Sequence, residues 1–204
     1  MRSGAMHVAH RGAFGNLQRG GDFPIRHIHQ HAQQQACAGS FIQRSQAGKH
    51  AVIELGLVRL QRAADGHQFL IRSGRALVWP GYKGRYERRV GPIRGATERW
   101  ELQKQQVKDL RRAIDYVKTR NDLDAGAIGY YGLSWGATKG AWVLAMEDRI
   151  KAAVLSDEGL YLRTWELPEQ DQLHYLPRIK IPVLMLNGEY DATFPRVESQ
   201  ERMF

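Results

Sequence analysis

The pentapeptide Gly132-Leu133-Ser134-Trp135-Gly136 is the feature that most constrains the fold of this chain. It matches the pattern G-x-S-x-G, in which small residues allow a sharp turn from a strand into a helix and leave the serine side chain accessible. The apolar and aromatic run at 127–131 predicts a buried strand before the turn, and 137–146 predicts a helix after it. Ser134 is therefore a candidate nucleophile. The alternative is a glycine-rich turn of some other α/β domain.

Strand and helix patterns alternate on both sides of this turn. The spacing of apolar residues predicts a long helix over about 100–120, with one buried face made by Leu102, Val107, Leu110, Ala113, Ile114 and Val117. Other predicted elements are a helix end at 68–72, strands at 76–79, 151–155 and 181–186, irregular structure at 158–178 and a helix start at 195–204. A turn is expected at 121–126. The alternation indicates an α/β fold: a three-layer α/β/α sandwich with a mostly parallel sheet.

Residues 1–66 differ in composition from residues 67–204. They are rich in His and Gln and hold eight Lys and Arg against three Asp and Glu, within a chain of net charge +9. The run 51–58 predicts a strand, whereas 30–35 predicts loop or disorder. We expect a poorly defined basic segment at 1–66 and one domain at 67–204. A basic module that binds nucleic acid or an anionic surface is an alternative for 1–66, although no nucleic-acid-binding motif is present.

The chain has no segment that predicts insertion into a membrane. No stretch approaches the roughly 18 consecutive apolar residues of a spanning helix, and the first residues lead into no apolar leader segment. The single cysteine, Cys37, cannot form an internal disulfide. We therefore expect a cytoplasmic location.

Asp191 is the candidate acid that would orient the base of a serine nucleophile. It follows the apolar strand at 181–186, and the loops at the carboxyl ends of strands gather the functional groups of an open α/β sheet. The order Ser134 then Asp191 also matches one of the known orders of a serine triad. Two alternatives remain: Asp191 caps the helix that starts near Pro195, or Asp157 supplies the acid instead.

Neither a metal nor an organic cofactor is predicted. The histidines of 27–31 alternate, as ligands on one face of a strand would, but Ala32 occupies the aspartate position of the H-x-H-x-D-H pattern. The arginines of 85–89 predict a solvated loop, or a preference for acidic substrates if this loop borders the site.

Three stretches together carry a resemblance to a known family: 73–88, 130–136 and 181–191. Residues 69–204 resemble the α/β-hydrolase superfamily, especially its dienelactone hydrolase-like and prolyl oligopeptidase-like serine hydrolase domains. The resemblance implies that Ser134 is the nucleophile, Asp191 the triad acid and the backbone N–H of Trp135 an oxyanion donor. It further implies cleavage of an ester, thioester or peptide bond of a small-molecule or peptide substrate, without a cofactor. In bacteria such domains often follow a protein kinase domain.

The chain departs from this family in two places. All eight histidines precede Asp191, and only 13 residues follow it, whereas the family takes its histidine from a loop after one further strand. We therefore expect a truncated C-terminus and a hydrolase fold that lacks its last strand and helix. His174 is the stand-in candidate for the base, and Gly39-Ser40 or Gly56 could supply the second oxyanion donor. The alternative function is a catalytically incomplete hydrolase-like fragment or interaction module.

Overall fold

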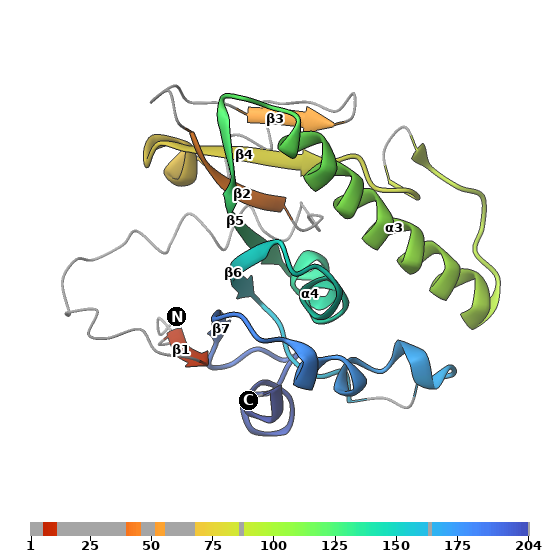
Figure 1. Ribbon diagram of the computed structural model, residues 1–204. Helices are drawn as coiled ribbons and strands as arrows, with labels where there is room; N and C mark the ends of the chain where they lie inside the picture. Colours follow the sequence, from red (N-terminus) through yellow and green to blue (C-terminus); the bar gives the residue numbers. More distant parts are fainter. Residues whose placement is uncertain are drawn as a thin grey trace.

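The computed structural model describes residues 6–11, 40–45, 52–55, 68–85, 88–162 and 165–203. Its strands form one seven-stranded sheet in the order β1-β7-β6-β5-β2-β4-β3 (Figure 1). The strands are β1 (Met6–Arg11), β2 (Ser40–Ser45), β3 (Val52–Leu55), β4 (Arg75–Pro80), β5 (Leu123–Leu133), β6 (Ile150–Ser156) and β7 (Val183–Gly188).

Most of the sheet is parallel. β5, β6 and β7 are parallel neighbours, as are β3 and β4. β2 pairs antiparallel with both β4 and β5, and β1 pairs antiparallel with β7. Strands β3 to β7 therefore all run in one direction, which confirms the predicted α/β fold with a mostly parallel sheet.

Two α-helices pack against one face of the sheet, α3 (Gly95–Lys118) and α4 (Trp135–Met146) (Figure 1). The buried face of α3 is close to the predicted one and consists of Ala96, Gln106, Val107, Leu110, Ala113, Ile114 and Val117. The helix begins earlier than expected, at Gly95, and there the Glu98 side chain accepts a hydrogen bond of 2.6 Å from the backbone N–H of Arg94. This bond satisfies a backbone donor at the helix start.

The opposite face of the sheet also carries a helical turn. Side chains alternate along β5, so Tyr130 joins the core under α3 and α4 while Tyr131 points to the other side. The ring of Phe69, in the helical turn 68–72, contacts the ring of Tyr131 edge-on at 6.1 Å. This turn ends at Ser73 and Gly74 as predicted, and Gly74 has the positive φ of 76° that glycine tolerates.

Three strands of the sheet come from the first 66 residues. β3 lies within the predicted run 51–58, but the sequence patterns did not predict β1 or β2. β1 pairs with β7 and β2 inserts between β4 and β5, so these parts of 1–66 belong to the same sheet as the rest. Residues 27–31 and 30–35, for which a metal site and a loop were considered, lie outside the described residues.

The remaining elements differ from expectation in detail. β5 begins at Leu123, so the expected turn at 121–126 is largely strand. The irregular segment after β6 contains three single helical turns, η2 (Pro168–Gln170), η3 (Gln172–His174) and η4 (Leu176–Arg178). Helical turns η5 (Arg196–Gln200) and η6 (Glu201–Met203) follow β7, as expected for 195–204. Among the described residues, no helix combines the length and hydrophobicity needed to cross a membrane.

Candidate functional site

Ser134 lies on a strained turn between β5 and α4. Its φ is +49° and its ψ is −113°, a backbone conformation that residues with a side chain rarely adopt. The backbone N–H of Ser134 donates to the carbonyl of Ser156 at 2.8 Å, and its own carbonyl accepts from the N–H of Thr138 at 2.9 Å. Such strain typically costs about 1–3 kcal/mol and clusters at functional sites. The surrounding structure therefore holds Ser134 in place.

The first glycine of the pentapeptide is required by close packing. A Cβ at Gly132 would lie 2.7 Å from the backbone N of Ala137 and from the carbonyl group of Gly136. These contacts are with backbone atoms, which cannot swing aside as a flexible side chain can. The Tyr130 hydroxyl also donates to the Gly136 carbonyl at 2.6 Å and fixes the start of α4. The turn predicted from the G-x-S-x-G pattern is therefore present.

Trp135, the predicted oxyanion residue, is the first residue of α4. Its backbone N–H is one of the first-turn donors that have no acceptor within their own helix. Its ring is surrounded by cations and an aromatic side chain: the Arg85 guanidinium is 4.2 Å from the ring centroid, the Lys139 ammonium is 4.0 Å away, and Tyr82 packs edge-on at 6.1 Å. These contacts hold Trp135 beside the loop after β4.

Lys139 is a buried cation that the sequence analysis did not select. Its side chain is 2% exposed, and its Nζ donates to the Gln106 side-chain oxygen. The amide nitrogen of Gln106 donates in turn to the Lys83 carbonyl at 2.7 Å. Burial, helped by the charge of Arg85, lowers the pKa of Lys139 to about 7. The available signal was a lone lysine within the apolar helix that follows the turn.

Asp191, the predicted acid, follows β7 and caps its own turn. Its Oδ1 accepts from the backbone N–H groups of Thr193 at 2.7 Å and Phe194 at 3.1 Å, and its N–H donates to the Gly188 carbonyl at 3.3 Å. The alternative that Asp191 caps the helix starting near Pro195 is therefore wrong, because η5 has no side-chain cap and the Asp191 bonds lie within the 191–194 turn. No hydrogen bond joins Asp191 to Ser134 in the described part of the chain.

The adjacent ends of β5, β6 and β7 place Ser134, Asp157 and Asp191 on one edge of the sheet. In the register of these strands, Leu133 lies beside Ser156 and Ser156 lies beside Leu186. Asp157, the alternative acid, also has a positive φ, of 55°, and its N–H donates to the Leu186 carbonyl at 3.0 Å. The structure therefore brings both candidate acids to the same edge as the serine.

Glu158 is a second buried ionisable residue that the sequence analysis missed. It is 0% exposed, and its two carboxyl oxygens accept from the Thr138 hydroxyl at 2.9 Å and the Gln172 amide at 2.7 Å. Its backbone N–H and carbonyl both pair with the side chain of Asn187. Burial raises the pKa of Glu158 to about 8, against the opposing effect of these hydrogen bonds. Its position directly after Asp157 was the one sequence signal for it.

His174, the predicted stand-in base, lies on η3 and is exposed. Its ring Nδ1 is 2.9 Å from the Pro168 carbonyl, six residues earlier in the same segment. No hydrogen bond joins His174 to Ser134 or Asp191 among the described residues. Of the two oxyanion candidates in the first 66 residues, Ser40 lies in β2 and the glycines lie outside the described ranges.

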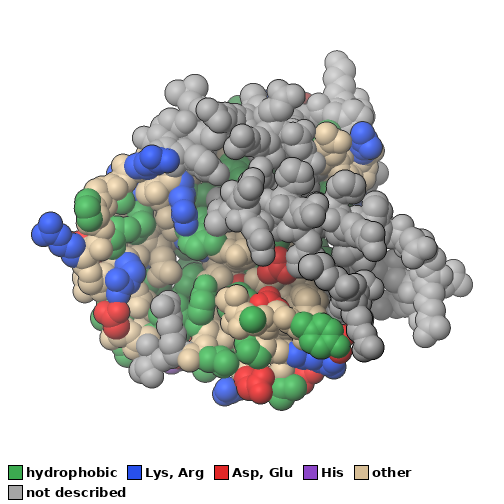
Figure 2. Space-filling view, turned by 180° about the vertical axis from the view of Figure 1, so that it is seen from behind, with side chains coloured by type: hydrophobic (Ala, Val, Ile, Leu, Met, Phe, Trp, Pro, Cys, Tyr) green, Lys and Arg blue, Asp and Glu red, His purple; other side chains and the backbone are tan. Residues whose placement is uncertain are grey.

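Charged side chains form no metal cluster in the described regions, and no single basic patch on the part of the face coloured in Figure 2. On the face shown in Figure 2, Lys and Arg side chains are spread among hydrophobic and acidic ones. Among residues 6–11, 40–45, 52–55, 68–85, 88–162 and 165–203, no three His, Cys, Asp or Glu side chains come together as metal ligands would.

A mostly parallel sheet that carries a serine on a strained strand-to-helix turn, with acidic residues after the next two strands, is the arrangement of the α/β-hydrolase fold. The model of the Dienelactone hydrolase family matches residues 76–203. The chain therefore belongs to this family, as its resemblance at the sequence level implied.

Two curated relatives from Bacillus subtilis (strain 168) match parts of the chain. It is 25% identical to "Uncharacterized peptidase YuxL" over 165 residues, which are 67% of this chain and 24% of that protein. It is 30% identical to "Putative hydrolase YtaP" over 77 residues, or 36% of this chain and 26% of that protein. The chain thus spans about a quarter of the length of each relative. No solved structure matches it significantly.

Proposed function

We propose that this chain carries the nucleophile of a serine hydrolase and that Ser134 forms an acyl-enzyme. The Ser134 hydroxyl attacks the carbonyl carbon of an ester, thioester or peptide bond while a base removes its proton. The backbone N–H of Trp135 stabilises the negative oxygen of the tetrahedral intermediate. Protonation of the leaving group completes acylation, and water then releases the acyl group as an acid and restores the serine.

One observation carries this proposal: the positive φ of Ser134 on the turn between β5 and α4. A strained, non-glycine residue persists only where its surroundings over-determine it, and the packing of Gly132 against the start of α4 does so here. Membership of the Dienelactone hydrolase family supports the proposal of a chemical role for this residue. Asp191 is the proposed triad acid because it follows β7 on the same edge of the sheet.

The base is the part of the mechanism that this chain does not supply in the family's usual position. All eight histidines precede Asp191, and the ring Nδ1 of His174 lies beside the carbonyl of Pro168. These observations favour a second candidate function, a hydrolase-like module that is catalytically incomplete by itself. Loss of the triad histidine typically lowers kcat by about 10⁶ and leaves roughly 10³–10⁴ over the uncatalysed rate. The two candidates therefore differ in rate rather than in fold.

A fluorophosphonate probe tests the proposal directly. We expect covalent labelling of the purified chain at Ser134, identified by mass spectrometry, and no labelling of Ser134→Ala. Ser73→Ala is the matched control, because Ser73 is an exposed serine in a different turn, and it should be labelled like the unmodified chain. A folded chain that reacts with no probe would favour the incomplete module.

Substrate, partners and location follow as part of the same proposal. We propose a small-molecule or peptide acyl substrate, no cofactor and a cytoplasmic location. Hydrolysis of 4-nitrophenyl acetate and of a peptide 4-nitroanilide would separate esterase from peptidase activity, because they release the chromophores 4-nitrophenol and 4-nitroaniline. A protein kinase domain in the same polypeptide, or encoded beside it, stays a prediction that genomic context can test.

A further inference from the structure

The peptide group between Ser134 and Trp135 carries the proposed oxyanion donor. The carbonyl of Ser134 and the backbone N–H of Trp135 belong to this one planar trans unit, so they point in opposite directions. A contact that fixes the carbonyl therefore also fixes the direction of the N–H. A residue that bonds to the Ser134 carbonyl can thus position the donor without touching the substrate.

The backbone strain at Ser134 favours rotation of this peptide group. Its φ is +49° and its ψ is −113°. At such a φ, the conformation open to a residue with a side chain has a ψ of about +30 to +60°, which is roughly 140° or more from the observed value. Relief of the strain would therefore turn the peptide group over and carry the Trp135 N–H away from its present direction. The present direction needs contacts that hold the carbonyl.

Thr138 makes two contacts with the Ser134 carbonyl. Its backbone N–H donates to the carbonyl oxygen at 2.9 Å, and its hydroxyl lies 3.3 Å from the same atom. A threonine in a helix often bonds to the carbonyl four residues earlier. Here, however, that carbonyl belongs to a strained peptide group that carries the oxyanion donor. A hydrogen bond to the carbonyl also polarises the peptide group and strengthens its N–H as a donor.

Glu158 holds the Thr138 hydroxyl beside this carbonyl. Thr138 Oγ1 is 2.9 Å from Glu158 Oε2, and the two residues are 5% and 0% exposed, so water does not compete for the contact. The hydroxyl has one hydrogen for two acceptors, Glu158 Oε2 and the Ser134 carbonyl. A protonated Glu158 donates its own hydrogen to Thr138 and leaves the hydroxyl hydrogen for Ser134. An ionised Glu158 accepts that hydrogen, and the carbonyl keeps only its backbone bond.

Gln172 directs the proton of Glu158 toward Thr138. Its amide nitrogen is 2.7 Å from Glu158 Oε1 and 3.5 Å from the Thr138 carbonyl. Two acceptors therefore face this nitrogen, which fixes the orientation of the amide. Because Oε1 already accepts from Gln172, the proton of the carboxyl group lies on Oε2, the oxygen that faces Thr138.

The other groups around Glu158 are neutral. Asn187, from β7, bonds to its backbone N–H and carbonyl. Tyr161 has its hydroxyl 3.5 Å from Thr138 Oγ1. Tyr130, from β5, has its pKa raised by burial and by the charge of Glu158. No charged side chain bonds to Glu158 in the part of the chain that the structure describes. Glu158 is therefore the group of this cluster that changes charge first as pH rises from neutral.

We propose that Thr138 is a positioning residue for the oxyanion donor: its hydroxyl, held by Glu158, keeps the Ser134–Trp135 peptide group turned so that the Trp135 N–H faces the reacting oxygen. The proposal rests on the proposed acyl transfer at Ser134. Thr138 acts through the peptide group, and Glu158 acts through Thr138.

Two variants of Thr138 test the proposal, because valine matches threonine in shape but lacks the hydroxyl, whereas serine keeps it. We expect fluorophosphonate labelling of the full chain to slow about fivefold in Thr138→Val and to stay within about twofold in Thr138→Ser. Thr119→Val is the control. It removes a hydroxyl bond of 2.7 Å to the Tyr116 carbonyl at the end of α3 and should leave the rate unchanged. Equal rates for the valine and serine variants of Thr138 would overturn the proposal.

The amide signal of Trp135 reports on the peptide group without any reaction. A hydrogen bond to the preceding carbonyl deshields the amide nitrogen, so the ¹⁵N resonance of Trp135 should move upfield in Thr138→Val and stay in place in Thr138→Ser. Thr138→Ala gives the same comparison if the valine variant does not fold. An unmoved signal in a folded variant without the hydroxyl would refute the positioning role. Complete lack of labelling of the unmodified chain would instead refute the reaction, and the Trp135 signal would still decide the role of Thr138.

The pH dependence of labelling tests the part played by Glu158. Burial raises its pKa to about 8, and Glu158→Gln keeps an uncharged donor at every pH. The oxygen of the new amide pairs with Gln172, so its nitrogen faces Thr138. The labelling rate of the unmodified chain divided by that of Glu158→Gln should be near one at pH 6.5 and fall about fivefold by pH 9.5. The ratio cancels every titration that the two chains share. A constant ratio would show that Glu158 does not act through Thr138.

Discussion

The Thr138 hydroxyl donates a hydrogen bond of 2.9 Å to Glu158 Oε2 inside the protein. Thr138 lies in the first turn of α4, and Glu158 follows the end of β6. The bond therefore joins the helix that follows Ser134 to the neighbouring strand end. Both atoms are buried, so the ionisation of Glu158 affects the stability of this junction.

Protonation of Glu158 should make the protein more stable at mildly acidic pH. Burial raises its pKa from the ordinary 4.5 to about 8, so between these values the folded state binds more protons than the unfolded state. The contribution of Glu158 is then fully present below pH 4.5 and is lost as pH rises through about 8. The slope approaches about −1.4 kcal/mol per pH unit within this window.

Urea unfolding of the unmodified chain and of Glu158→Gln from pH 4.5 to 9 would measure this effect. The neutral amide should remove the downward slope over this range. Glu101→Gln is the control, because Glu101 is an exposed residue of α3. Parallel pH dependences for the chain and Glu158→Gln would contradict the raised pKa.

Gly132→Ala should destabilise the fold more than other glycine substitutions in the same strand. The new Cβ would lie 2.7 Å from backbone atoms of Gly136 and Ala137, so the start of α4 must move. We expect a loss of about 3 kcal/mol or more in the free energy of unfolding. Gly126→Ala, also in β5, meets only the Asp124 side chain at 3.2 Å and should cost less than about 1 kcal/mol. Equal losses would show that the turn adjusts freely.

Ser134→Gly and Ser134→Ala should separate strain from chemistry. Both remove the hydroxyl and should abolish fluorophosphonate labelling. Only glycine relieves the strain of the positive φ at this position. We expect Ser134→Gly to be about 1 kcal/mol more stable than Ser134→Ala in chemical unfolding. A less stable glycine variant would mean that ordering the more flexible glycine on folding costs more free energy than the strain that it relieves.

The sequence predicted the elements around the turn because they follow simple side-chain patterns. The buried strand at 127–131 and the apolar face of α3 are examples, and both are present in the fold. β1 and β2 have no such pattern in the sequence. They are six-residue segments whose partners lie far along the chain: β1 pairs with β7, and β2 pairs with β4 and β5. Pairing with such distant strands leaves no local signal.

The candidate serine and acids were also predictable, whereas the buried polar residues around them were not. Lys139, Gln106, Glu158 and Gln172 have side chains that are usually exposed. They are buried here because each bonds to another: Lys139 to Gln106 across 33 positions, and Gln172 to Glu158 across 14. These partners come from different elements, so only the folded chain shows which hydrogen bonds offset part of the cost of their burial.

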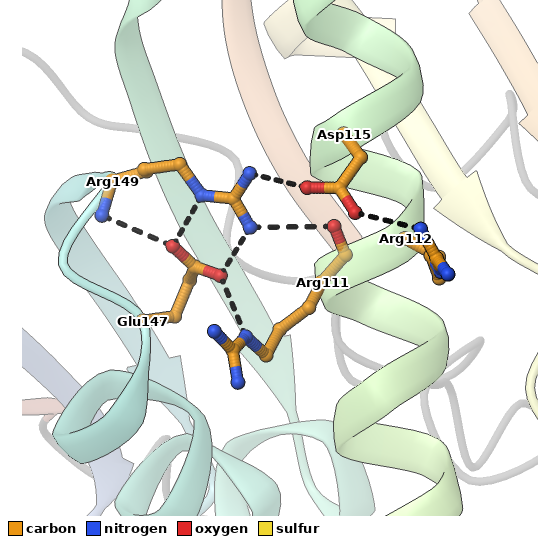
Figure 3. A network of polar contacts seen from close by, with 5 residues as sticks. All are labelled: Arg111, Arg112, Asp115, Glu147 and Arg149. Carbon is orange, nitrogen blue, oxygen red and sulfur yellow. Dashed lines mark hydrogen bonds and ion pairs between the residues drawn. The ribbon is translucent and has the colours of Figure 1, made fainter.

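Glu147 should be an important ion-pair partner for stability. It is 3% exposed at the end of α4, and Figure 3 shows its carboxylate facing Arg149 and Arg111. Arg149 donates two side-chain hydrogen bonds of 2.6 Å to it and bonds to Asp115 on α3 at the same distance. Although burial alone would raise the pKa of Glu147, these hydrogen bonds lower it. The carboxylate therefore stays charged and joins α4 to α3.

Glu147→Ala should lower the free energy of unfolding by about 2 kcal/mol, because it leaves a partly buried arginine without its main partner. Glu101→Ala removes an exposed partner of Lys104 and should change stability by less than about 1 kcal/mol. Urea denaturation at pH 7 would compare the two variants. A loss of similar size in both would contradict a special role for the buried carboxylate.

Lys139 should give a pH dependence opposite to that of Glu158. Burial lowers its pKa from 10.5 to about 7, so between these values the unfolded state binds more protons and stability rises with pH. Lys139→Met should remove this rise, whereas Lys104→Met, at an exposed position of α3, should keep it.

The two residues together should give a minimum in stability. The stabilising contribution of Glu158 decreases as pH rises to about 8, whereas that of Lys139 increases as pH rises above about 7. Their combined contribution is therefore smallest between these two pH values. Urea unfolding from pH 5 to 10 would show this minimum in the unmodified chain, and the double variant Glu158→Gln with Lys139→Met should lack it. A minimum that persists in the double variant would assign the pH dependence to other groups.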